Sequence, residues 1–268
     1  TQTDRPSVAA HCGTSVLDCR RGRYSAAQLR SSTYHHYSLL FAIQDWYYKR
    51  MYYDSRAHAG QLLAAELVPK YRYEDCAVVA LSDGGVLVGE QVAAQLHCIL
   101  TMLVTEEIDI PGENMSFGAV SQAGNFTYNS QFTDGQINEY TSEFHGYLAE
   151  QKRQAFSRIN KLIGDGGLID KDMLRDRTII LISDGFDNGA VLSVALDFLK
   201  PIRINKLVVA APVATIPAVD QLHVMADELH ILDVKENYMG TNHYYTDNEV
   251  PSHEETVAKI NQIILNWQ

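Results

Sequence analysis

Two acidic side chains, Asp184 and Asp187, lie in a turn that is bounded by Gly185 and Gly189. The apolar, β-branched run 178–182 before this turn predicts a strand, and an apolar helical pattern follows it. A strand, a glycine-bounded turn and a helix N-terminus form a common anion-binding arrangement, because backbone N–H groups converge there and the helix dipole adds positive charge. Two carboxylates oppose a bound anion, so the functional interpretation depends on what they contact.

Three roles for these side chains stay open from the residues alone. Asp184 and Asp187 could hold a divalent cation, although the turn lacks the full spacing of a calcium loop. Asp184 could instead cap the turn or the following helix. Gly185 and Gly189 could serve the backbone conformation, a ligand, or both.

A second glycine turn, Ser82-Asp83-Gly84-Gly85, also follows an apolar run. In a parallel sheet, ligands bind beyond the carboxyl ends of the strands. Because both turns come directly after strands, we expect them at the same edge of one sheet.

Strands and helices alternate along most of the chain, which predicts an α/β fold with a mostly parallel five-stranded core sheet flanked by helices. The predicted strands are 77–81, 99–104, 178–182, 207–211 and 229–234. The predicted helices are 55–68, 86–96, 138–163, 190–199, one that starts near 217, and one that follows a capping box at 252–255. Residues 105–116 are expected to form a polar loop, and 117–121 with 125–128 a small hairpin.

The chain of 268 residues suits one α/β domain with an appendage. The regular alternation predicts a domain over 51–268, preceded by an N-terminal extension over 1–50. The part 34–50 of this extension is aromatic, and it is expected to dock as a helix on the domain or to assist assembly.

Charge and cysteine usage exclude several functions. Residues 1–50 hold seven Lys and Arg and three Asp and Glu, whereas residues 51–268 hold fifteen Lys and Arg and thirty Asp and Glu. The acidic character of 51–268 argues against nucleic-acid binding, because nucleic acids are themselves negatively charged. No apolar run has membrane-spanning length. Cys76 and Cys98 lie at the edges of apolar runs and are expected to be buried thiols, which favours a reducing cytoplasm.

Five segments, in a consistent order, resemble the type I phosphoribosyltransferases, and most closely the bacterial predicted members of that family. The turn 183–191 resembles the loop that binds phosphoribosyl diphosphate (PRPP), and 80–86 is similar to the family's diphosphate-binding loop. Segment 106–112 resembles a flexible segment, 117–120 the strand after it, and 238–245 the aromatic C-terminal loop. The resemblance covers about 51–268 and implies a small hood over the sheet.

The resemblance also implies a reaction, in which a nitrogenous base displaces diphosphate from PRPP with Mg²⁺ as cofactor. By this resemblance Asp184 is the catalytic, ribose-contacting acid, and Tyr238 and Tyr244 are candidates for stacking on the base. Tyr245 belongs to the same aromatic loop, and His243 is a candidate proton carrier.

The PRPP-like loop departs from the family pattern. Asp184, Gly185 and Gly189 match, but Ser183 replaces the first acid and Asp187 replaces a small residue. Asn188 replaces a Thr and keeps hydrogen-bonding capacity. One ribose contact is therefore expected to be lost or weakened.

Acidic residues replace basic ones in the segments that resemble the diphosphate-binding loop and the flexible segment. Asp83 stands where the subgroup has Arg, and Glu106 and Glu107 stand where it has Arg-Lys, unless they are only solvated loop charges. At roughly 5 Å and an effective dielectric constant near 20, a pair of like charges costs about 3 kcal/mol. PRPP is a polyanion, so the sequence predicts weak binding of PRPP.

Two functional hypotheses follow. The first is a phosphoribosyltransferase-like protein with a degenerate site, a pseudoenzyme that binds a small nucleotide-like ligand or another protein and forms a homodimer. The alternative is an active enzyme of nucleotide metabolism, in which Mg²⁺ bridges the carboxylates and the phosphates of PRPP.

Overall fold

The computed structural model of the chain describes residues 52–112, 116–129, 131–163, 169, 171–187 and 190–266. The N-terminal extension predicted over 1–50 lies outside these described residues, as do Asn188 and Gly189 of the PRPP-like turn.

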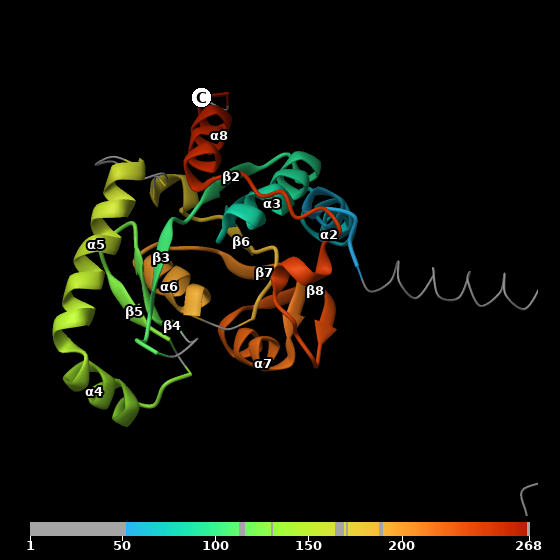
Figure 1. Ribbon diagram of the computed structural model, residues 1–268. Coiled ribbons are helices and arrows are strands. Elements are labelled where there is room, and N and C mark those ends of the chain that lie inside the picture. Colours follow the sequence, from blue (N-terminus) through green and yellow to red (C-terminus); the bar gives the residue numbers. More distant parts are fainter. Residues whose placement is uncertain are drawn as a thin grey trace, which may run out of the picture. The chain divides into compact units, whose positions relative to one another are not determined.

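A five-stranded parallel sheet in the order β2-β1-β6-β7-β8 organises the domain (Figure 1). Its strands are β1 (Cys76–Ala80), β2 (Ile99–Met102), β6 (Thr178–Ile182), β7 (Lys206–Thr215) and β8 (Glu228–Lys235). The central strands β1 and β6 are buried along their whole length, as expected for apolar strands covered on both faces. The predicted α/β class and the five core strands are confirmed.

The side chains of successive strand residues enter two separate cores, one on each face of the sheet. Val78 and Ile180 pack with helices α2 (Arg56–Tyr71), α3 (Asp83–Leu96) and α8 (His253–Asn266). Val79 and Leu181, one residue further along, pack with helices α6 (Ala190–Leu199) and α7 (Ile216–Met225). Two short 3₁₀ helices, η1 (Lys171–Leu174) and η2 (Thr241–Tyr244), complete the connections.

Serine residues fix where α2 and α3 begin. Ser55 and Ser82 are the N-caps, and their hydroxyls accept hydrogen bonds from the amides of His58 and Gly85 at 3.1 and 2.9 Å. The prediction that α3 starts at Val86 was wrong, because the cap at Ser82 brings Asp83 and both glycines into the first helical turn.

A second, antiparallel sheet lies where the sequence predicted a loop and a hairpin. Its strands are β3 (Thr105–Asp109), β4 (Ser116–Ser121) and β5 (Phe126–Tyr128). The predicted polar loop over 105–116 was therefore wrong for its first half: Ile108 is buried while the neighbouring Glu107 is exposed, the alternation of a strand that is half covered. This alternation could not be recognised in the sequence, because Glu106 and Glu107 place two charged residues at consecutive positions.

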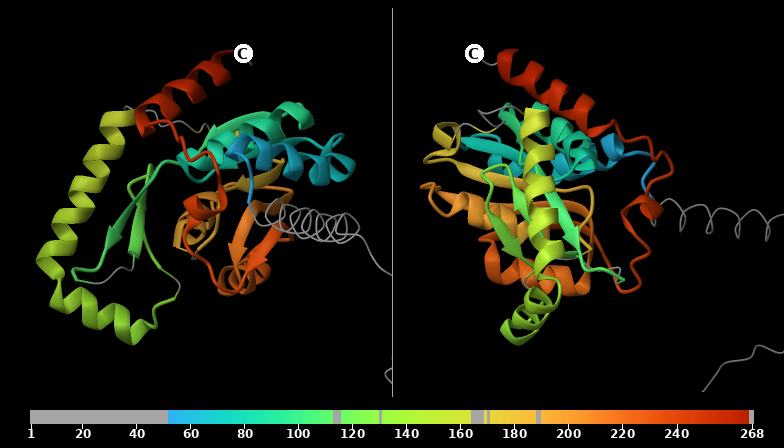
Figure 2. Two further views of the ribbon diagram at one scale, coloured as in Figure 1. Left: turned by 45° about the vertical axis from the view of Figure 1, so that its right-hand side comes forward. Right: turned by 60° about the vertical axis from the view of Figure 1, so that its left-hand side comes forward.

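Two helices replace the single long helix predicted over 138–163. They are α4 (Asp134–Glu143), which begins in a capping box of Thr133 and Gln136, and α5 (His145–Ile163). Figures 1 and 2 show α4, α5 and the antiparallel sheet together at one side of the parallel sheet, where α5 packs on β3 and β4. This group is the hood that the resemblance implied.

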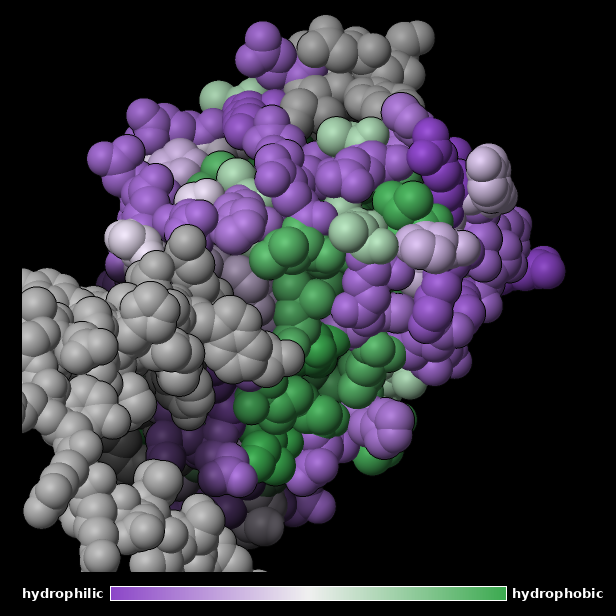
Figure 3. All heavy atoms as spheres, turned by 90° about the vertical axis from the view of Figure 1, so that its right-hand side faces the viewer, coloured by the Kyte–Doolittle hydropathy of each residue, from purple (hydrophilic) through white to green (hydrophobic). Residues whose placement is uncertain are grey.

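Hydrophobic residues gather in a band on the face shown in Figure 3, which is the side of Figure 1 where α2, β8 and α7 lie. Exposed apolar side chains on these elements include Leu62, Val224 and Val234. The predicted homodimer stays a prediction. Cys76 and Cys98 are buried free thiols, as predicted, and no helix in the described part of the chain has the length and apolar character needed to cross a membrane.

Candidate functional site

The two glycine turns lie side by side at the carboxyl edge of the parallel sheet. They follow β1 and β6, which are hydrogen-bonded neighbours with Ala80 opposite Ile182. The hydroxyl of Ser82 donates a hydrogen bond to Oδ1 of Asp184 at 2.7 Å, so the turns are in direct contact. The expectation of a single edge with both turns is confirmed.

Asp184, the acid retained in the PRPP-like turn, is engaged in a buried ion pair. Its Oδ2 accepts a hydrogen bond from Nε of Arg56 at 2.8 Å, and the two residues are only 8% and 3% exposed. The hydroxyl of Tyr245 donates to the backbone carbonyl of Asp184 at 2.6 Å. Both carboxylate oxygens therefore have partners within the protein, from Arg56 and from Ser82.

Arg56 is one of the residues that sequence reasoning missed, and it contacts three other segments of the chain. Its Nη2 donates to Oδ1 of Asn242 at 2.5 Å, and its guanidinium lies 4.6 Å from the centre of the Tyr245 ring. Nη1 of Arg56 is buried and has no hydrogen-bond partner among the described residues. The only local signal was its place directly after the cap Ser55, which says nothing about a partner 128 positions away.

Gly84 lets α3 approach this ion pair. A Cβ on Gly84 would lie 2.0 Å from Oδ2 of Asp184 and 2.6 Å from Nε of Arg56. The glycine is thus required by close packing.

We therefore expect Gly84→Ala to destabilise the fold by about 1–3 kcal/mol, since the added methyl group must displace the ion pair. The control is Gly146→Ala in α5, where a Cβ meets nothing within 4 Å and helix propensity should stabilise by up to about 1 kcal/mol. Urea unfolding of both variants checks this. Equal stabilities for the two would contradict the packing role.

The other residues of the PRPP-like turn differ in their surroundings. Ser183 is buried, and its hydroxyl donates to the carbonyl of Gly185 at 2.9 Å. Asp187 is exposed, and its carbonyl accepts a hydrogen bond from Oγ1 of Thr215 at 3.1 Å. Within the described residues no group of three or more His, Cys, Asp or Glu side chains is arranged to hold a metal ion. A metal role for Asp184 and Asp187 stays a prediction.

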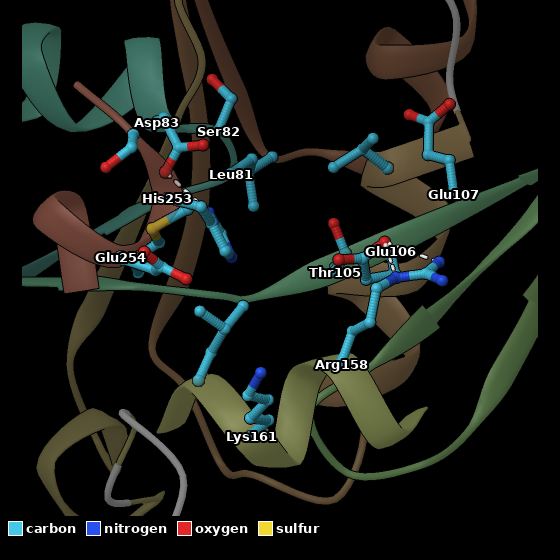
Figure 4. Close-up of a pocket in the computed structure, with 14 residues that line it drawn as sticks. Leu81, Ser82, Asp83, Thr105, Glu106, Glu107, Arg158, Lys161, His253 and Glu254 are labelled. Carbon is cyan, nitrogen blue, oxygen red and sulfur yellow. Dashed lines mark hydrogen bonds and ion pairs between the residues drawn. The ribbon is translucent and has the colours of Figure 1, made fainter. Parts of the chain in front are cut away.

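A pocket of about 990 Å³ opens beside the diphosphate-like turn (Figure 4). Most of its wall comes from the start of α3, strand β3, the C-terminal part of α5 and the start of α8, and Met102 of β2 and Val191 of α6 complete it. Four carboxylates line it, those of Asp83, Glu106, Glu107 and Glu254. The basic side chains in the wall are Arg158, Lys161 and His253.

Glu106 and Glu107 line this pocket from strand β3 and not from a loop. Arg158 of α5 donates from Nη2 to Glu106 at 3.1 Å, so one of the two acids is already paired. Desolvation at the pocket wall raises the pKa of Glu107 although its side chain remains exposed, and a hydrogen bond with Ser116 opposes this shift. The resemblance to a flexible segment therefore does not extend to its backbone conformation.

Asp83, the acid that replaces an arginine of the family, is paired with a histidine. Nδ1 of His253 lies 2.8 Å from Oδ1 of Asp83. The capping box that was predicted over 252–255 is present, with Ser252 N–H donating to Glu255 Oε2 at 2.9 Å, and it makes His253 the first residue of α8. The hydrogen bond to Asp83 raises the pKa of His253, against an opposing effect of desolvation.

The aromatic loop packs over the PRPP-like turn. A Cβ on Gly185 would lie 2.6 Å from the hydroxyl of Tyr238, so this ring closes over the turn. Burial raises the pKa of Tyr238 to about 12. Tyr244 is 3% exposed, with its ring centre 5.3 Å from that of Tyr238, whereas His243 is exposed and hydrogen-bonded to Tyr52. Base stacking stays a prediction, and Tyr238 is the better placed ring because Tyr244 is enclosed.

Comparison with known proteins agrees with this arrangement. No protein-family model matches the chain. A Mycobacterium tuberculosis protein named "Putative phosphoribosyl transferase", present in two strains, is 25% identical over 211 residues. The match covers 77% of this chain and 46% of the relative, so the chain spans about half the length of the curated relatives it matches.

Similarity to a solved structure also covers most of this chain. A crystal structure from Thermus thermophilus is 26% identical, with a TM-score of 0.60, over 81% of this chain and 99% of that one. A purine phosphoribosyltransferase from Pyrococcus horikoshii is 12% identical, with a TM-score of 0.38, over 72% of this chain and 89% of that one, a similarity too low to support an inference. The chain is thus an α/β protein with a phosphoribosyltransferase-like fold, and its curated relatives are named as phosphoribosyl transferases.

Proposed function

We propose that this chain binds a phosphate-bearing, nucleotide-like small molecule at the carboxyl edge of the sheet, with weak or no transferase activity on PRPP. The observation that carries the proposal is the ion pair of Asp184 with Arg56, which is 2.8 Å long and buried. In the resemblance Asp184 contacts ribose, but here its two oxygens already accept hydrogen bonds from Arg56 and Ser82. A ribose hydroxyl would have to compete with the buried guanidinium of Arg56 for the carboxylate of Asp184.

The charge of the pocket supports the same conclusion. Four carboxylates face Arg158, Lys161 and one histidine, and Arg158 is paired with Glu106. A diphosphate placed there meets like charges at several positions. Each repulsive pair of charges costs about 3 kcal/mol at roughly 5 Å in an effective dielectric constant near 20. A ligand with a single phosphate and a neutral remainder suits the pocket better than PRPP.

An active transferase is the second candidate, and one observation favours it. Arg158 and Lys161 lie one helical turn apart on α5 and line the same pocket, so cations are present there although the loops lack them. The donor set does not fit Mg²⁺ well, because the oxygens of Asp184 are engaged by Arg56 and Ser82. We therefore derive no step through a metal ion.

Calorimetry with four ligands tests the proposal: PRPP with Mg²⁺, PRPP without it, ribose 5-phosphate and AMP. We expect AMP or ribose 5-phosphate to bind more tightly than PRPP, and no release of diphosphate when PRPP and Mg²⁺ are mixed with adenine, guanine or hypoxanthine. Diphosphate release that depends on the added base would establish the active alternative. Absence of binding by all four ligands would refute the proposed ligand class.

The cellular assignments remain predictions. A bacterial source, the cytoplasm and a place in nucleotide metabolism follow only from the resemblance and from cysteine usage. A protein partner in place of a small ligand is the outcome to pursue if none of the four ligands binds.

A further inference from the structure

Asp83 and His253 form an acid–histidine pair in the pocket wall. The two residues begin helices α3 and α8, which are far apart in sequence, and they meet through the 2.8 Å contact between Oδ1 and Nδ1. Their side chains are about a quarter exposed, 27% for Asp83 and 25% for His253. Figure 4 shows the imidazole ring directed into the space between α3, β3 and α5.

The second ring nitrogen of His253 has no partner in the described part of the chain. Nε2 is buried and makes no hydrogen bond to any residue that the structure describes, although Nδ1 of the same ring is engaged by Asp83. Because the carboxylate accepts the Nδ1 proton, Nε2 is an acceptor in the neutral ring and an N–H donor in the protonated ring. An unpartnered buried donor is unfavourable, so the protonated state calls for an acceptor from a ligand.

The other charged groups around the pair come from three elements. Glu106 and Glu107 lie on β3, Glu254 on the same helix as His253, and Arg158 and Lys161 on α5. Glu106 is neutralised in part by Arg158 at 3.1 Å. The acids favour a protonated imidazole and the bases oppose it, and the effect of Asp83 and Glu106 on the pKa of His253 is upward.

We propose that the Asp83–His253 pair is a pH-dependent anion-binding group, in which Nε2–H of the protonated imidazole binds a phosphate or diphosphate oxygen of the ligand. This inference rests on the proposed function, because it assumes a phosphate-bearing ligand. On this proposal, the positive charge that binds the anion beside Asp83 comes from His253 of α8. This charge is present only when the imidazole is protonated.

The direction of the pH effect follows from the charge of the imidazole, which binds an anion only when it is protonated. The charged imidazole persists to a higher pH than in a free histidine, since its pKa is raised above the usual 6.5. Affinity for the anion is therefore fully present at low pH and is lost as the pH rises through that raised value. A charge-assisted hydrogen bond of this kind corresponds to about a tenfold difference in affinity.

Calorimetric titration of the full chain with inorganic phosphate, without metal, at pH 6 and pH 9 tests this. The probe itself titrates in this range, so the quantity compared is the ratio of its dissociation constants for H253Q and the unmodified protein at each pH. We expect a ratio of about 10 at pH 6 and about 1 at pH 9. H253R should bind equally at both values after correction for the probe, and H223Q, which changes an exposed histidine on α7, should behave as the unmodified protein.

A parallel titration with ribose 5-phosphate separates this inference from the proposed function. If ribose 5-phosphate binds and the H253Q ratio stays near 1 at pH 6, the inference about His253 is wrong while the proposed function stands. The same holds if the ratio is large but equal at both pH values, because His253 then acts only through structure. If neither probe binds at pH 6, both the proposed ligand class and the role of His253 are refuted.

Discussion

Replacing Asp184 with asparagine should destabilise the protein by about 3–5 kcal/mol, because it leaves the guanidinium of Arg56 buried without its counter-ion. The expectation rests on the 2.8 Å ion pair, in which the side chains are 2% and 11% exposed. The same substitution in a solvated catalytic carboxylate would reduce turnover and leave the fold intact. Unfolding in urea therefore distinguishes an acid that chiefly holds the site together from one that is free to meet a substrate.

A double-mutant cycle isolates the ion pair from other effects. Arg56→Met should also destabilise, and the double variant should lose less than the sum of the two single variants, because neither charge is then left unpaired. The matched control is Glu150→Gln, which removes the partner of Arg153 on the surface of α5, where the side chains are 45% and 75% exposed. An exposed pair of this kind contributes little to stability, because water screens the attraction between its charges.

The outcome bears on function as well as stability. If Asp184→Asn unfolds at the same urea concentration as Glu150→Gln, the pair with Arg56 does not stabilise the native state. Asp184 would then be available to a ligand, and the active alternative would gain weight. Additive effects of the two substitutions would also indicate that the pair of Asp184 with Arg56 does not stabilise the native state.

The parallel sheet and the contact between its two turns could be predicted from the sequence, because both depend on local patterns. Apolar β-branched runs such as 178–182 specify buried strands, and the rule that ligands bind beyond the carboxyl ends of parallel strands places Ser82 and Asp184 together. The strand β3 could not be predicted in this way. Its Glu106 and Glu107 have low β-propensity, and pairing with β4 supplied the stabilisation that the local sequence lacks.

The cations of the site were beyond prediction for a different reason. Arg56, Arg158 and His253 lie 128, 52 and 170 positions from the acids they contact. No local period relates such residues, and only the packing of α2, α5 and α8 brings them to the sheet edge. The prediction of an acid-lined site was therefore incomplete: the acids are present, but three of them have partners contributed by helices.

Asp83→Arg combined with Glu107→Lys should strengthen PRPP binding by about a hundredfold in the absence of metal, since two repulsive contacts become attractive. Both side chains line the pocket, and neither carries the buried ion pair, so the fold should tolerate the change. Asp83→Arg also removes the partner of His253, and the new guanidinium takes over the role of the titrating imidazole. The gain should therefore persist at pH 9.

A control with the same change in net charge separates the pocket from the overall field of the protein. Glu139→Arg with Glu143→Lys places two cations on the exposed surface of α4, outside the pocket wall. This control should gain far less affinity, and what it gains should vanish at high salt, because long-range attraction is screened beyond roughly 10 Å at 0.1 M. If both double variants bind PRPP equally, or neither gains affinity, the acids of the pocket do not limit binding. The binding of PRPP would then be limited by Asp184, because its oxygens remain engaged by Arg56 and Ser82 in either variant.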